Sequence, residues 1–254
     1  MTYTLDCQEQ TGHYAGFFYR DKTRRAIIHY IHQSREQLPV QALVALCKTH
    51  STHPDFVRWK NAIELYGHYL KQIVASTQPY GMAPNGVYKK KEYEDKDGFY
   101  RLHLWAPDNA TELSDQQLQE GIQIDDNHYI RRFPVWFNIF NGNEALILST
   151  GKAATLCGRY LNDDTLMNIG REQLYWTVGK NPLCQSLIYG EGHRYPSQDS
   201  FSSGEIVGEI PVGIRSLGNT DVPYFPMTNN ACYKEVWLTS AGKWLSLLAD
   251  LISL

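Results

Sequence analysis

The chain has 254 residues, a formal net charge of -3 and an apolar share of 43%. This length suits one large domain, and the apolar share is ordinary for a protein with a packed core. Charges of both signs are spread along the chain, whereas a nucleic-acid-binding surface would concentrate Lys and Arg on one face. We therefore expect a single domain over residues 1–254 and no nucleic-acid partner.

The sequence also argues against several other classes of protein. It has no apolar run of about 18 residues, so no membrane span is expected. Its five cysteines lie far apart and its nine histidines are scattered, so we expect neither a disulfide framework nor a metal site. Neither a nucleophile elbow of the Gly-x-Ser-x-Gly type nor a phosphate-binding loop occurs, and no organic cofactor is expected.

Apolar residues at helical spacing predict three helices in the first part of the chain, beginning near Asp21, after Pro39 and at Phe56. Their apolar faces consist of Ile27, Ile28 and Ile31; of Val40, Leu43, Val44 and Cys47; and of Phe56, Trp59, Ile63, Tyr66, Leu70 and Ile73. The pattern changes after Gly81, where turn residues separate short runs rich in aromatic and branched side chains. The alternating run 99–105 is typical of a strand, so we expect a small β excursion around residues 85–135.

The second half predicts two helices over about residues 144–160 and 163–178, and a last helix from about Glu235 or Thr239 to Leu251. Residues 179–231 form a long loop rich in Gly, Pro, Ser, Tyr and acidic side chains. Loops of this length are usually functional or disordered, and their aromatic content argues against disorder. Helix pairs followed by long loops favour a mainly α fold, an incomplete (α/α) toroid of helical hairpins. A plain helical bundle is the alternative.

Carboxylates and aromatic rings alternate along this loop. Hydrolysis of a glycosidic bond needs one carboxylic acid to protonate the leaving oxygen and a second carboxylate to activate water or attack the sugar. The loop and its end supply Glu191, Glu205, Glu209, Asp221 and Glu235. The rings between them can stack on sugar faces, so the sequence favours a carbohydrate substrate.

Three segments of the last third of the chain resemble family 9 glycoside hydrolases. The segment from Trp176 to Arg194, which contains Gly179-Lys-Asn-Pro182, resembles the family's Leu-Gly-x-Asn-Pro stretch, and Gly204-Glu-Ile-Val-Gly-Glu-Ile-Pro211 resembles its Gly-Ala-Leu-Val-Gly-Gly-Pro. The segment from Asn219 to Tyr224, followed by Lys234-Glu-Val236, resembles its final Asp-Tyr and Asn-Glu-Val block. The resemblance implies an (α/α)6 toroid, a glycosidase activity and an exported parent protein.

The resemblance also assigns roles to residues of this sequence. It implies that Glu235 is the proton donor, and Asp221 of the same block is the second catalytic candidate. Candidates for substrate binding are His193, Arg194, Tyr189, Glu191 and Tyr224 in the loop, together with His32, Arg35 and Trp105 elsewhere. His32 and Arg35 belong to a polar stretch between apolar segments, where a helix end facing the toroid centre would bind sugar. Trp105 is a candidate for the wall of the cleft.

One family motif does not occur. The water-activating aspartates of the family lie in an Asp-Ala-Gly-Asp motif that this chain does not contain, which implies that the chain is the C-terminal part of such a domain. Within the chain, Asp6, Glu9, Asp125 and Asp126 are the remaining candidates for a base. A polysaccharide lyase, with a Tyr or His base and Arg194 against a uronate carboxylate, is an alternative, as is a noncatalytic carbohydrate-binding or structural helical domain.

Overall fold

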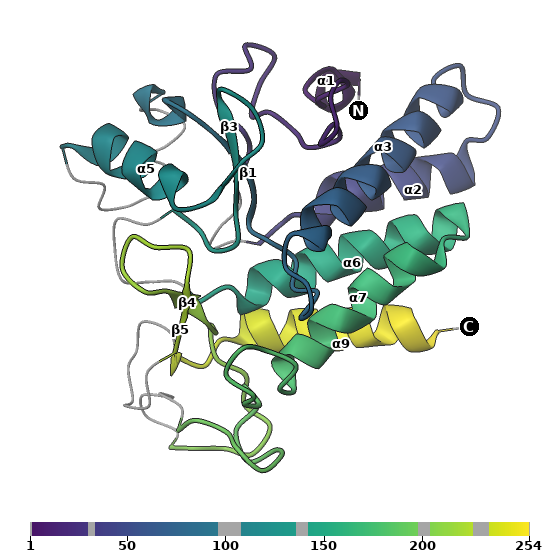
Figure 1. The fold of residues 1–254 in the computed structure, drawn as a ribbon. Helices are drawn as coiled ribbons and strands as arrows, with labels where there is room; N and C mark the ends of the chain where they lie inside the picture. Colours follow the sequence, from purple (N-terminus) through teal and green to yellow (C-terminus); the bar gives the residue numbers. More distant parts are fainter. Residues whose placement is uncertain are drawn as a thin grey trace.

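The computed structural model describes residues 2–29, 34–95, 108–135, 142–197, 204–225 and 234–253. These residues form a mainly helical body with a small antiparallel sheet beside it, as the sequence predicts at this coarse level (Figure 1). The helices are α1 (Thr2–Asp6), α2 (Gln37–Thr49), α3 (Phe56–Ala75), α5 (Ala110–Gln119), α6 (Glu144–Leu161), α7 (Asp164–Thr177) and α9 (Leu238–Ile252). None of the described helices combines the length and apolar character that crossing a membrane requires.

Helix α6 is the centre of the helical body. It packs against α2, α3, α7 and α9, and thirteen of its 18 residues are buried, so that only a narrow strip faces solvent. Such burial requires small residues where neighbouring helices approach. A Cβ added at Gly151 would lie 2.8 Å from Gln173 of α7 and 2.9 Å from Leu247 of α9. The glycine thus lets two helices pack closely on the same turn of α6.

The helices α2, α6 and α9 all begin at one end of this body, and α7 ends there. The backbone N–H of Gln37, the first residue of α2, donates to Ser149 Oγ of α6 over 3.3 Å. Lys243, in the second turn of α9, donates to the carbonyl oxygen of Ser34 ahead of α2. At the end of α7, Thr177 donates to Glu144, the first residue of α6. We call this end of the helical body the loop end, and Figure 1 shows β4 (Arg215–Ser216), β5 (Pro223–Tyr224) and the loops after α7 gathered beside it.

The helices predicted near residues 40–47, 56–73, 144–160 and 163–178 are confirmed as α2, α3, α6 and α7. Helix α3 buries the face that its spacing predicts, from Trp59 to Ile73. The Asp163 side chain accepts a hydrogen bond from the Leu166 N–H over 3.2 Å, so it caps α7 as the polar linker predicts. The last helix, α9, begins at Leu238, three residues after Glu235.

The helix predicted from Asp21 through Ile27 and Ile28 is wrong within the described residues. Instead, residues 18–20 and 26–28 pair as short antiparallel arms: Arg20 N–H donates to the Ala26 carbonyl over 2.9 Å, and Ile28 N–H to the Phe18 carbonyl over 3.0 Å. Asp21 Oδ1 accepts the Thr23 N–H over 2.8 Å, which favours a turn over a helix. Ile31, His32 and the end of this prediction lie outside the described residues.

The small β excursion is confirmed in part. Strand β3 (His128–Arg131) lies between β1 (Gly86–Lys89) and β2 (Ile122–Gln123), antiparallel to both, with Val87 opposite Ile130. Helix α5 packs beside this sheet and was not predicted, because its sequence is polar and it buries only Ala110, Ser114, Gln117 and Leu118. A short 3-10 helix, Glu92–Glu94, contacts α5. The strand predicted at 99–105, which includes Trp105, lies outside the described residues.

Gly16 lets the segment that follows α1 pack closely on α3. We call this segment, residues 7–29, the N-terminal loop. Gly16 has φ +125°, and an added Cβ would overlap the Leu65 carbonyl oxygen and lie 2.7 Å from Tyr69 Cβ. Gly12, in the same loop, has φ +90° and nothing within 4 Å of the added Cβ. The two glycines therefore differ in steric overlap while sharing a positive φ.

We expect Gly16→Ala to lower the free energy of unfolding by about 2 kcal/mol more than Gly12→Ala does. An alanine at either position is strained by the positive φ, but only the alanine at position 16 also overlaps α3. Urea denaturation followed by tryptophan fluorescence measures both values. Equal losses for the two variants would show that the loop does not need close contact with α3.

Candidate functional site

The long loop after α7 is fixed at its start by the buried side chain of Asn181. Its Nδ2 donates to the carbonyls of Trp176, over 2.9 Å, and Gln185, over 2.8 Å, while its Oδ1 accepts the Leu183 N–H over 3.1 Å. Leu187 N–H then donates to the carbonyl of Thr177 over 2.7 Å. The Asn181 side chain thus holds the turn by which the chain leaves α7.

A later part of the same loop, residues 210–214, is held between the first turn of α6 and residues 235–237. On one side, the N–H groups of Asn143 and Glu144 donate to the carbonyls of Ile214 and Val212, over 2.8 Å and 3.0 Å. On the other side, Val212 N–H donates to the Glu235 carbonyl over 2.8 Å, and Pro211 bridges to Val236. We call this arrangement the 210–214 seam. It satisfies N–H groups at the start of α6 that no helical carbonyl can reach.

The main chain of Glu235 belongs to this seam, and its side chain is half-buried. Within the described part of the chain, no hydrogen bond reaches the Glu235 carboxylate. Because α9 begins only at Leu238, Glu235 lies ahead of the helix and does not open it. The residue therefore combines a backbone held by hydrogen bonds with a carboxylate that accepts no hydrogen bond from the described residues.

The structure places Asp221 in a different cluster, at the hairpin of β4 (Arg215–Ser216) and β5 (Pro223–Tyr224). Its carboxylate is buried and accepts the N–H groups of Arg132 and Phe133, each over 3.0 Å. The guanidinium groups of Arg131 and Arg132 lie 3.6 Å and 3.5 Å from it. Burial raises the pKa of Asp221, although the charge of Arg131 opposes this. These contacts anchor the hairpin to β3.

A second group of loop residues lies around Tyr189. Its hydroxyl donates to Glu205 over 2.7 Å, and its ring meets that of Tyr195 edge-on at a centroid distance of 5.3 Å. The hydrogen bond to Glu205 raises the pKa of Tyr189. The charge of Glu205 also acts on Lys234, which is fully buried with its ammonium 5.5 Å from the Phe225 ring centroid. Burial lowers the pKa of Lys234.

The other predicted binding residues are spread over the loop end. Glu191, His193 and Arg194 are exposed in the turn that follows Tyr189, and the Arg194 carbonyl accepts the Ser186 N–H over 2.9 Å. Tyr224 is 38% exposed on β5. Arg35 is exposed just ahead of α2, whereas His32 and Trp105 lie outside the described residues. The structure thus brings Tyr189, Glu191, His193 and Arg194 onto one turn.

The four acids predicted as possible bases lie away from the seam. Asp6 pairs with Lys22 and Arg58, Glu9 with Arg24 and the Tyr19 hydroxyl, and Asp125 with His128. Asp126 is exposed in the turn before β3. Each pairing stabilises the N-terminal loop or the sheet, and none of these acids contacts Glu235 within the described chain.

Two acids at the loop end are not identified as site residues by the sequence: Glu144, which is fully buried, and Glu36, which is half-buried with its Oε2 atom enclosed. Burial raises the pKa of Glu36 to about 7 and that of Glu144 to about 8. Glu144 is fully buried at the first residue of α6, where an acid is usually exposed and complements the helix dipole. Glu36 belongs to the polar stretch with His32 and Arg35, but nothing in that stretch distinguishes it from a solvated helix end.

The described residues contain no group of three or more His, Cys, Asp and Glu side chains placed to bind a metal ion. No known family model matches the chain, and no curated protein sequence matches it significantly.

We expect Asp221→Asn to lower the free energy of unfolding by about 3 kcal/mol, because the amide leaves Arg131 buried without its counter-charge. Asp126→Asn, at an exposed position, is the control and should change stability little. Thermal and urea unfolding measure both. A variant as stable as the wild type would contradict the anchoring role of Asp221 and return it to the list of catalytic candidates.

Proposed function

We propose that this chain forms part of a helical-toroid glycoside hydrolase, that it binds carbohydrate at the loop end, and that Glu235 is the proton donor. The observation that carries the proposal is the position of Glu235. Its backbone is held by the 210–214 seam, while its carboxylate is left without a partner among the described residues, beside loops rich in rings and acids. A general acid needs this combination of a fixed position and an accessible carboxyl group.

The arrangement of the helices supports the toroid. The neighbours α2, α6 and α9 begin at the same end, and α3 and α7 run back towards it, as in a row of helical hairpins (Figure 1). Helix α9 bears an exposed apolar stripe along one face, with Leu238, Leu245 and Ile252 exposed by 88%, 62% and 69%. These residues are spaced seven apart, the spacing of a helix face that packs on another helix. We infer that further helices of the ring pack on this stripe.

The environment of Tyr189 favours a hydrolase over a lyase. A tyrosine that abstracts a proton works best when its pKa is lowered towards the working pH. Here the hydrogen bond to Glu205 raises the pKa of Tyr189, since it stabilises the protonated phenol. Glu191, Glu205 and Glu209 also lie in this loop, and they would repel an anionic uronate polymer.

We expect Glu235→Gln to lower kcat by about 100-fold or more on substrates with a poor leaving group, because the amide cannot protonate the departing oxygen. A dinitrophenyl glycoside, whose leaving group needs no protonation, should lose far less activity. Glu64→Gln is the matched control, because Glu64 is an exposed acid of α3 outside the candidate site. The assay measures reducing ends from a panel of neutral polysaccharides and the release of dinitrophenol from a matched panel of aryl glycosides.

An equal effect on both kinds of substrate would contradict the role of Glu235 as acid. A wild-type chain that binds polysaccharide without cleaving either kind of substrate would favour the noncatalytic carbohydrate-binding alternative. Binding is followed separately by affinity electrophoresis in gels containing each polysaccharide.

A further inference from the structure

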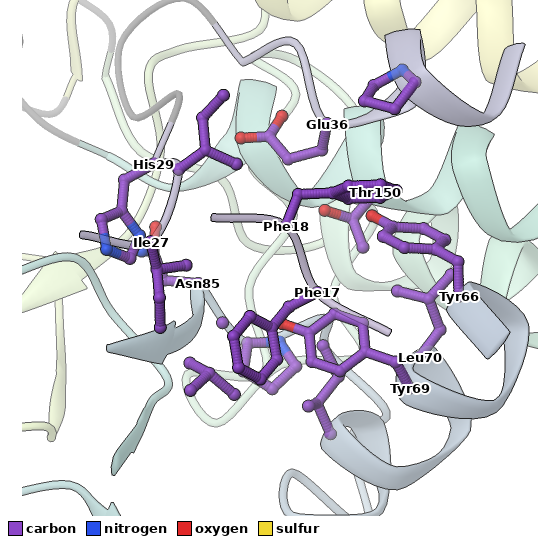
Figure 2. A pocket seen from close by; sticks show the side chains of 16 residues that line it. Phe17, Phe18, Ile27, His29, Glu36, Tyr66, Tyr69, Leu70, Asn85 and Thr150 are labelled. Carbon is purple, nitrogen blue, oxygen red and sulfur yellow. The ribbon is translucent and has the colours of Figure 1, made fainter. Parts of the chain in front are cut away.

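A small cavity lies where the N-terminal loop meets α2, α3 and β1 (Figure 2). Its walls are largely aromatic, with the rings of Phe17 and Phe18 from the loop and of Tyr66 and Tyr69 from α3. It has a volume of about 60 Å³ and is partly open to solvent. This is room for a few water molecules or one small polar group, and too little for a sugar ring.

Two acceptor atoms on the cavity wall lack a donor. Glu36 Oε2 and Asn85 Oδ1 are both buried, and neither has a hydrogen-bond partner within the described part of the chain. A buried acceptor without a donor costs roughly 1–3 kcal/mol, so an occupant that brings N–H or O–H groups would be favoured. Figure 2 labels both Glu36 and Asn85 among the residues that surround the aromatic rings.

The charges around Glu36 favour a cationic occupant. Burial raises the pKa of Glu36 to about 7, and the Ser149 hydroxyl and the Lys243 ammonium only partly oppose this. Lys243, from α9, already donates to the Ser34 carbonyl, and His29 of the loop is paired with Glu92 over 2.9 Å. On α3, the Tyr69 phenol has its pKa raised by burial and remains uncharged. A cation in the cavity would add to the positive charge of Lys243, which offsets the cost of burying the carboxylate only in part.

Aromatic walls strengthen the preference for a cation over a neutral group of the same size. The faces of Phe and Tyr rings carry partial negative charge and attract an ammonium within about 6 Å of the ring centroid. A carboxylate together with several such rings is the usual composition of a site for ammonium groups. The Thr150 side chain, from α6, adds a hydroxyl to the same wall.

We propose that this cavity binds the protonated amino group of a small primary amine, with Glu36 as counter-ion and the rings of Phe18, Tyr66 and Tyr69 as walls. The site is separate from the 210–214 seam and does not depend on glycosidase activity. The ammonium group donates to the free oxygen of Glu36, and the carbon attached to it lies against the rings.

Methylammonium and methanol form a matched pair of probes, because they have nearly the same size and differ in charge. With the wild-type chain at pH 8, we expect methylammonium chloride to raise the Tm beyond the effect of equimolar potassium chloride, and methanol to give no such rise. Titration calorimetry should give saturable binding of methylammonium. Glu36→Gln should abolish both effects, whereas Glu64→Gln, on the exposed face of α3, should leave them unchanged.

The pH dependence has a defined sign. Protonation of Glu36 competes with the cation, so the affinity should fall about tenfold between pH 8 and pH 6 if the pKa is about 7. Glu36→Gln removes a buried carboxyl, so it should fold and be at least as stable as the wild type at pH 8. Equal affinity of Glu36→Gln and wild type, equal affinity at the two pH values, or methanol binding as tightly as methylammonium would each overturn the proposal. The proposal would also be overturned if the wild-type chain showed no saturable binding of methylammonium, because the cavity would then hold only water.

Discussion

The close packing around α6 is the constraint on which the rest of the structure depends. A helix buried on most of its sides approaches its neighbours most closely where one partner has no side chain, and glycines supply these places. A Cβ added at Gly158 would lie 2.9 Å from the backbone nitrogen of Met167, and one added at Gly170 would overlap the Thr155 hydroxyl. Together with Gly151, these residues fix α7 and α9 against α6 and so fix the position of the loop end.

The proposed glycosidase function rests on that end. The first turn of α6 offers N–H groups that need acceptors, and the 210–214 seam supplies them from a loop distant in sequence. The seam in turn accepts and donates hydrogen bonds with residues 235–237, the segment that carries Glu235. Helix packing therefore fixes the proposed acid through two sets of backbone hydrogen bonds, one from α6 to the seam and one from the seam to Glu235. Among the described residues, no ion pair to the Glu235 side chain contributes.

The helical body could largely be predicted, because its helices are long and keep their apolar period. The prediction fails where the period is short or absent. Three isoleucines after Asp21 fit a helix and an extended arm equally well, and only the pairing of residues 18–20 with 26–28 decides between them. Helix α5 has too few apolar residues to be recognised, since it packs on a sheet that is itself small.

The candidate site could be predicted as a segment but not as an arrangement. Sequence patterns identify the loop between α7 and α9, and a resemblance to one hydrolase family selects Glu235 within it. They also select Asp221, whose contacts with β3 depend on residues about ninety positions earlier in the chain. Glu36 and Glu144 have no sequence signal, because their unusual acidity comes from burial by distant segments.

Hydrogen exchange tests the central claim, that the 210–214 seam fixes Glu235 to the buried first turn of α6. The backbone amides of Asn143, Glu144 and Val212 all donate within the seam. Our account predicts that they exchange as slowly as the amides in the middle of α6, while the exposed turn at Gly192 and His193 exchanges quickly. Fast exchange of Val212 alongside a protected α6 would contradict it, because Glu235 would then belong to an unanchored loop.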